Sequence, residues 1–136
     1  YSTYLSYLPK ECFCYKINEK IDNRGIFVEM LKTKNSGQIS YFTAYPGITR
    51  GEHYHHTKTE KFLVIKGEAL FRFCNIINGE KFEIKINGKV PEIVDTIPGW
   101  SHSITNIGNE EMLVLLWANE NFDEKKPDTI GYKIQK

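Results

Sequence analysis

The sequence predicts an all-β protein, built as a sandwich or a barrel with little helix. Short β-prone runs recur along the chain between turn residues, and no segment keeps a helical period for long. The Asn-Gly pair at 78–79 is a strong hairpin signal, and a second Asn-Gly pair, at 87–88, closes the run 81–86. Many short strands at regular spacing are typical of sandwiches and barrels.

The composition fits one globular domain. A chain of 136 residues is long enough for one core and too short for two substantial ones. Lys and Arg number 18 against 17 Asp and Glu without a basic stripe, so nucleic acid is not an expected partner. No apolar run could span a bilayer and no signal peptide is visible, so we expect a cytoplasmic protein without membrane contact. The three cysteines favour free thiols over a disulfide framework.

The expected elements follow one another along the chain. Tyrosine and leucine at helical spacing predict one or two turns before Pro9, in a linker or docking segment over residues 1–11. The β-barrel is expected over residues 12–122, followed by a C-terminal tail over residues 123–136. The strands expected in the barrel are 25–31, 38–45, 61–67, 69–77, 81–86, 92–97, 102–107 and 111–118.

Two of these strands differ in their side-chain pattern. In 81–86, Phe82, Ile84 and Ile86 alternate with charged residues, which predicts a strand with one face in water. In 111–118 residues of both parities are apolar. This second pattern indicates a strand covered on both faces, so we expect a partner subunit and a homodimer.

Three of the four histidines lie in the stretch "GITRGEHYHHTKTE". His53 and His55 leave the same face of an extended strand, and Glu60 follows after a turn. Together with His102 from a separate turn-strand unit, they predict a metal site. Imidazole and carboxylate ligands suit zinc, iron, manganese or nickel, and spacing does not choose among these metals. The alternative is a surface run of histidines with His102 as a buried structural residue.

The spacing of these residues resembles the two sequence motifs of the cupin superfamily. Gly47-x5-His53-x-His55-x4-Glu60-x6-Gly67 matches the first motif, and Pro98-Gly99-x2-His102-x3-Asn106 resembles the second. One departure is Ile97, which stands where the family usually has proline. The resemblance implies the cupin double-stranded β-helix, a jelly-roll barrel. It also implies a metal site with the ligands His53, His55, Glu60 and His102.

Longer stretches carry a closer resemblance. "DNRGIFVEMLKT", "PGITRGEHYHHTKTEKFLVIKGEA" and "WANENFDEKKPDT" are similar to the C-terminal cupin domain of the capsular-polysaccharide bifunctional epimerase/reductase family, which acts in making UDP-N-acetyl-L-fucosamine. This implies a zinc-containing isomerase that epimerises carbon 3 of a UDP-2-acetamido-2,6-dideoxy-4-hexulose through an enolate. It also implies a reductase domain, N-terminal or separate, that then reduces the ketone. No Rossmann glycine fingerprint occurs in the chain, so we expect no NAD(P) site here.

Two residues near the ligands are candidates for the general base that removes a proton next to the ketone. His56, beside His55, is the preferred titrating group, and Lys61, beside Glu60, is second. Regular strand parity points both side chains away from the ligand face. A surface role is therefore the alternative for each of them.

Substrate contacts are expected from cations and aromatic side chains. Arg50, Lys58 and Arg72 are candidates for binding the UDP phosphates, and Trp100 and Tyr45 for lining the sugar pocket. A solvated face is the alternative for the cations, and core packing for the aromatic residues. No glycine-rich phosphate loop occurs, so the UDP-linked 4-keto sugar is implied by the resemblance alone.

Two other functions stay open. One is a cupin dioxygenase, which would bind a redox metal and consume oxygen. The other is a non-catalytic dimerisation domain, in which a metal only stabilises the barrel. An open coordination position would argue against the second, because structural metal sites normally lack one.

Overall fold

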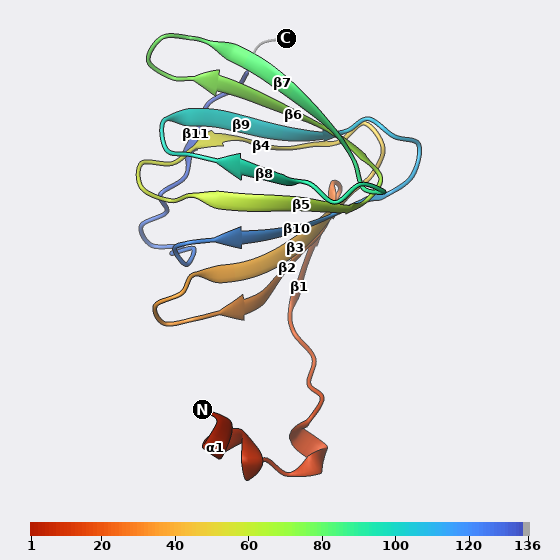
Figure 1. Cartoon of the computed structure of the whole chain (residues 1–136), viewed down its shortest axis with the longest axis vertical. Helices are drawn as coiled ribbons and strands as arrows, with labels where there is room; N and C mark the ends of the chain where they lie inside the picture. Colours follow the sequence, from red (N-terminus) through yellow and green to blue (C-terminus); the bar gives the residue numbers. More distant parts are fainter. Residues whose placement is uncertain (135–136) are drawn as a thin grey trace.

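Two antiparallel sheets face each other in the computed structural model, which describes residues 1–134 (Figure 1). The six-stranded sheet has the order β1 (Glu19–Asp22), β2 (Gly25–Lys32), β3 (Gln38–Ala44), β10 (Met112–Ala118), β5 (Glu60–Lys66) and β8 (Ile93–Thr96). The five-stranded sheet has the order β11 (Ile130–Gly131), β4 (Thr49–Tyr54), β9 (Trp100–Asn106), β6 (Glu68–Asn75) and β7 (Lys81–Asn87). The all-β class expected from the sequence is confirmed.

Each strand run expected from the sequence corresponds to a strand of the structure, from β2 and β3 through β5 to β10. Three further strands lack the apolar alternation that identifies the others. β1 has three charged residues out of four, β4 places polar residues inward, and β11 is only two residues long. Their pairing with neighbouring strands, rather than their own composition, makes them strands.

The core lies between the two sheets and reaches the candidate site. Phe42, Val64, Phe71 and Val114 are buried there and come from both sheets. Alternation along each strand sends these side chains inward, as expected for sheets with one covered face. The ring of Phe62 lies 5.9 Å from that of Phe71 and 6.0 Å from that of His102, so the core packs directly against this histidine.

The outer face of the six-stranded sheet carries an apolar row. Directly paired residues of antiparallel strands share a face, and Tyr41, Leu115, Leu63 and Ile93 are paired in turn across β3, β10, β5 and β8. Within the single chain these side chains are partly or fully exposed. β10 is thus buried on its inner face by the core, while its outer apolar face keeps contact with solvent.

The N-terminal segment runs away from the barrel (Figure 1). It contains α1 (Ser2–Ser6) and a 3-10 turn at Lys10–Cys12, and neither buries a residue. Among the described residues, no helix has the length and hydropathy that a membrane crossing requires. Cys12, Cys14 and Cys74 are free thiols, as expected.

Candidate metal centre

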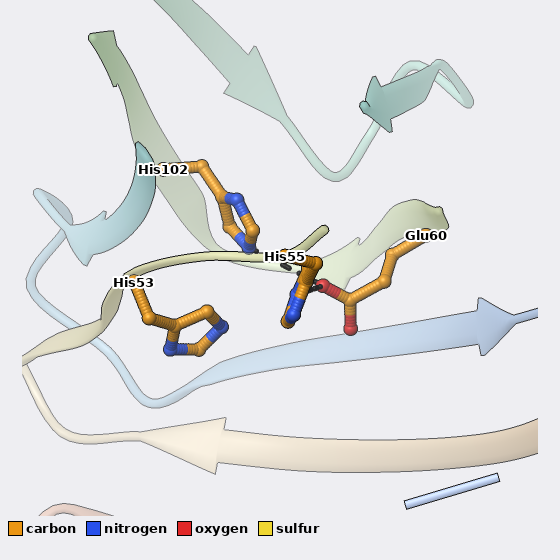
Figure 2. Close-up of side chains that lie close together, drawn as sticks. All are labelled: His53, His55, Glu60 and His102. Carbon is orange, nitrogen blue, oxygen red and sulfur yellow. Dashed lines mark hydrogen bonds and ion pairs between the residues drawn. The ribbon is translucent and has the colours of Figure 1, made fainter. Parts of the chain in front are cut away.

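Three side chains that are close in the sequence and a fourth from a distant strand converge inside the barrel. His53, His55, Glu60 and His102 each offer a ligand atom, and these atoms all lie within 4.8 Å of one another. Figure 2 shows the three imidazoles and the carboxylate turned toward a common point, with His102 arriving from a different strand than His53. His55, Glu60 and His102 are buried, and His53 is partly exposed.

An irregularity in β4 lets this strand contribute two inward side chains that regular parity would separate. The register between β4 and β9 shifts between Gly51 and His53, so Arg50 pairs with Ile104 while His53 pairs with His102. At the shift Glu52 has a φ of 60° and Gly51 a φ of 91°. A β-bulge of this kind re-aims the following side chain, which brings His53 to the face that Arg50 also occupies.

Hydrogen bonds to main-chain oxygens orient two of the imidazoles. The Nδ1 of His55 donates to the carbonyl oxygen of Asp128, and the Nδ1 of His102 lies 3.4 Å from the carbonyl oxygen of Trp100. A carbonyl oxygen only accepts, so in the neutral ring the proton sits on Nδ1 and the lone pair on Nε2. Both Nε2 atoms therefore face the centre of the cluster.

These Nε2 atoms lie next to the carboxylate of Glu60. Glu60 Oε1 is 2.8 Å from Nε2 of His55 and 3.3 Å from Nε2 of His102. The second contact lacks hydrogen-bond geometry, so Nε2 of the buried His102 has no hydrogen-bond partner among the described residues. A buried polar atom without a partner is costly, and a cation at the centre would satisfy it.

The electrostatics of the cluster favour a bound cation. Burial, followed by repulsion from His102 and His55, lowers the pKa of His53 to about 3, so this imidazole is neutral at pH 7. Burial alone would raise the pKa of Glu60, but the adjacent rings of His102 and His55 hold it well below its ordinary value. Neutral imidazole at His53 together with an ionised carboxylate at Glu60 is ligand chemistry of zinc and other divalent transition metals. The residues present fit a metal ion.

The cluster borders a cavity of about 390 Å³. His53, Glu60 and His102 line it on one side, and the apolar side chains of Phe42, Phe62, Ile104 and Leu116 form part of the wall. Polar and charged residues also line it: Lys20, Asp22, Arg24, Glu29, Gln38, Ser40, Arg50, Lys58 and Glu120. A group bound next to the histidines would therefore meet both apolar surface and charge.

Two of the expected substrate contacts lie in this cavity. Arg50 is buried, donates from Nε to the carbonyl oxygen of Thr43 at 3.0 Å, and stacks 5.1 Å from the ring of Phe42. Lys58 is also buried, with its ammonium 5.7 Å from the ring of Phe122. Both bring positive charge into a partly enclosed space.

The two residues expected as general base do not reach the cavity. His56 lies outside it with its side chain 67% exposed, and its ring contacts that of Tyr54. Lys61 lies on the outer face of β5, where its ammonium pairs with Asp95 at 2.8 Å. Lys61 faces outward because side chains alternate along a strand and its neighbour Glu60 faces inward.

Arg72, Trp100 and Tyr45 are also outside the cavity. Arg72 is paired with Ser103, one position from the inward-facing His102, so its side chain leaves the opposite face of the sheet. The ring of Trp100 packs against the core and lies 5.5 Å from the ring of Phe82. Core packing is therefore the role that the structure gives to Trp100.

Asp128 in the C-terminal region supports the cluster of histidines and glutamate, and the sequence did not predict this. Asp128 contacts His55 through its carbonyl oxygen, and β11 follows two residues later. The segment 123–136 was expected as a tail, yet Ile130 and Gly131 pair with Tyr54 and His53 of β4. No pattern within the segment announces this, because the contact is made to a strand far away in the chain.

The asparagine of the second motif has a structural role. Asn106 is buried and donates from Nδ2 to the carbonyl oxygens of Ala44 and Glu110, each at 2.8 Å. Its Oδ1 accepts from the N–H of Gly108 at 2.9 Å. It therefore closes the connections at one end of the barrel rather than contacting the cluster.

Most of the chain matches a known protein family. Residues 20–130 match the family described as the polysaccharide biosynthesis C-terminal domain. The chain belongs to this family. The four clustered residues lie within the part of the chain that matches the family.

Similar proteins agree with this membership of the polysaccharide biosynthesis C-terminal domain family. The UDP-2-acetamido-2,6-beta-L-arabino-hexul-4-ose reductase of Pseudomonas aeruginosa is 62% identical over 134 residues, covering 98% of this chain and 36% of that protein. The structure of the capsular polysaccharide assembling protein CapF from Staphylococcus aureus is 44% identical with a TM-score of 0.91, covering 98% of this chain and 36% of that one. The chain thus spans little more than a third of either relative.

A more distant solved structure supports the fold and nothing beyond the fold. A conserved protein of Klebsiella pneumoniae with a double-stranded β-helix domain is 24% identical, with a TM-score of 0.58, and covers 73% of this chain and 79% of that one. The expected cupin double-stranded β-helix is confirmed. The expected resemblance to the capsular-polysaccharide epimerase/reductase family is confirmed as well.

Proposed function

We propose that this chain is the metal-dependent epimerase domain of a nucleotide-sugar enzyme, which inverts carbon 3 of a UDP-2-acetamido-2,6-dideoxy-4-hexulose. The observation that carries the proposal is that three of the four clustered side chains line a cavity large enough for part of a sugar. A metal site that only stabilises a fold is normally closed by its protein ligands, whereas a catalytic one keeps an open position. The printed names of the relatives from P. aeruginosa and S. aureus support the substrate class and a role in capsule or surface polysaccharide synthesis.

His53, His55, Glu60 and His102 are the proposed ligands, and zinc is the proposed metal, with iron, manganese and nickel as alternatives. When bound, a divalent cation supplies Lewis-acid stabilisation of negative charge that develops on a carbonyl oxygen. The hydrogen bonds from His55 and His102 to main-chain oxygens keep their lone pairs directed at the cluster. This preorganisation means that little rearrangement is needed for binding.

Epimerisation next to a ketone needs one group to remove a proton and another to return a proton to the opposite face. We propose Lys58 and Glu120 for these steps, in place of His56 and Lys61. Both line the same cavity as the cluster, and Lys58 is buried there. Glu120 accepts from the hydroxyl of Thr57 at 3.0 Å, which orients its carboxylate.

Binding of the substrate is assigned to the remaining wall of the cavity. Arg50 and Lys58 provide positive charge for the diphosphate or for the oxygen that becomes negative during the reaction. The apolar surface of Phe42, Phe62 and Leu116 suits the less polar side of a 6-deoxy sugar. Water is partly excluded by these side chains, which strengthens the electrostatic contacts.

The proposal includes two further partners. A reductase domain, N-terminal or separate, would reduce the ketone with its own NAD(P) site, and the small share of the relatives that this chain spans supports such a partner. We also propose a homodimer in the cytoplasm. Its interface would be the apolar row of Tyr41, Leu115, Leu63 and Ile93, since a two-fold axis would place one such row against another.

The decisive experiment is proton NMR of the UDP-linked 4-keto sugar in deuterated water. With zinc-loaded protein we expect deuterium to enter at carbon 3, and chelation should stop the exchange. No exchange with fully metallated protein would overturn the proposal. Oxygen consumption on the substrate would instead favour a dioxygenase, and a melting temperature that falls on chelation without any exchange would favour a structural metal.

A further inference from the structure

We infer that Asp128 is a positioning residue for the metal centre, which holds His55 and the turn after it in the geometry that the metal requires. The inference rests on the proposed metal site and assigns to it a residue that contributes no ligand atom. Asp128 approaches the cluster from outside, through the segment that precedes β11.

The first observation concerns the orientation of His55. Nδ1 of this ring donates to the carbonyl oxygen of Asp128, while Nε2 lies 2.8 Å from Glu60. In the neutral ring the proton therefore sits on Nδ1, toward the main-chain oxygen of Asp128, and the lone pair of Nε2 is available to a metal. Outer partners of this kind fix the rotation of a ligating ring and its basicity.

The second observation concerns the backbone between the ligands. Oδ1 of Asp128 accepts from the N–H of His56 at 2.8 Å, and Oδ2 accepts from the N–H groups of Thr57 and Lys58 at 2.9 and 3.1 Å. The hydroxyl of Thr57 adds a contact to Oδ2 at 3.2 Å. One carboxylate therefore satisfies three successive N–H groups of the turn that joins His55 to Glu60.

The charge of Asp128 suits this role. An aspartate is ionised at pH 7, and the oxygens of this side chain meet the N–H groups of His56, Thr57 and Lys58. The side chain is thus a carboxylate at neutral pH, and hydrogen bonds to an ionised acceptor are about twice as strong as neutral ones.

The segment that carries Asp128 is itself attached to two of the three strands that bring ligands, β4 and β9. β11 pairs Ile130 with Tyr54 of β4. Two residues after Ile130, the N–H of Tyr132 donates to the carbonyl oxygen of Glu52 at 2.8 Å. The carbonyl oxygen of Tyr132 accepts from the hydroxyl of Ser101 on β9 at 2.7 Å. These contacts fix the position of Asp128 relative to β4 and β9.

The test is the zinc affinity of the whole chain, measured by competition with a chromophoric chelator. Asp128→Ala keeps the main-chain oxygen that accepts from His55 but removes the carboxylate that holds the turn, so zinc binding is expected to weaken roughly 10-fold, the lower end of the loss usual for an outer partner of a metal site. Asp128→Asn keeps an acceptor oxygen but not the charge, so an intermediate loss is expected. Asp123→Ala is the matched control, because among the described residues this exposed aspartate of the same segment accepts only from the nearby N–H of Lys125, and the variant should bind zinc like wild type.

A measurement on the unaltered chain covers the case in which Asp128→Ala fails to fold. In metal-free wild-type protein we expect slow hydrogen exchange at the amides of His56, Thr57 and Lys58. Unprotected amides, or equal zinc affinity for folded Asp128→Ala and Asp123→Ala, would overturn the inference. Failure of the wild-type chain to bind zinc or another divalent metal would instead overturn the proposed metal centre.

Discussion

His53 and His102 are directly paired across β4 and β9, and their rings meet edge to face with centroids 4.8 Å apart. The pairing joins the two sequence motifs at one point. It depends on the bulge at Gly51 and on the inward orientation of His102 against the core at Phe62.

Replacing His102 by alanine is expected to weaken zinc binding by more than the roughly 10–100-fold that loss of an outer partner costs, because a ligand atom itself is removed. Competition with a chelator measures the change. His56→Ala is the matched control, since this neighbouring histidine is exposed and lies outside the cavity. Similar losses for the two variants would contradict the ligand assignment.

Replacing Lys58 by methionine is expected to slow deuterium exchange at carbon 3 by about 10²–10⁴-fold, the usual contribution of a positioned proton-transfer group. Glu120→Gln should slow it as well, by removing the second group. Lys61→Met serves as the control, because Lys61 lies on the outer face of the sheet. The assignment is wrong if Lys61→Met slows exchange as much as Lys58→Met does.

Replacing Gly51 by alanine is expected to destabilise the barrel and to weaken zinc binding. The left-handed backbone at this position costs a residue with a Cβ about 1–2 kcal/mol, and an added Cβ would lie 2.8 Å from the carbonyl oxygen of His102. Gly79→Ala separates the two effects, since Gly79 also has a positive φ but no atom within 4 Å of an added Cβ. Urea denaturation should show the larger loss for Gly51→Ala, and equal losses would exclude a steric contribution.

The hairpin at the cavity mouth should contribute stability that depends on pH. A hydrogen bond from Arg24 lowers the pKa of Asp22 to about 2, against about 3.9 for an unfolded aspartate. Between these values the unfolded chain binds more protons, so the stabilisation present above about pH 4 is lost as the pH falls toward 2. Urea titrations from pH 6 to pH 2 should show a steeper loss for wild type than for Asp22→Asn. Parallel curves would show that the pair does not contribute.

The apolar row on the outer sheet face predicts a dimer that a single charge disrupts. Ile93→Glu places a carboxylate at the end of this row and should convert the dimer to a monomer in light scattering after size exclusion. Ile77→Glu is the control, because Ile77 is 91% exposed and lies beyond β6 in the five-stranded sheet. A monomeric wild type, or a dimer that survives Ile93→Glu, would rule out this interface.

Much of the architecture is visible in the sequence because it depends on local patterns. Alternation in strands such as 81–86 predicts strands that the structure contains, and the Asn-Gly pair at 78–79 predicts the hairpin of β6 and β7. The intervals around His53, His55 and Glu60 likewise predict a shared face. These features depend only on neighbours along the chain, because the side chains of a strand alternate with a fixed period of two.

Only the tertiary structure decided which other residues reach the site. A bulge in β4 turns Arg50 and His53 to one face, while regular pairing in β6 turns Arg72 to the other. Asp128 joins the centre because two residues after it a short strand pairs with β4. Register, bulges and contacts between distant strands depend on the energy of the assembled sheets, so no interval within the sequence could supply them.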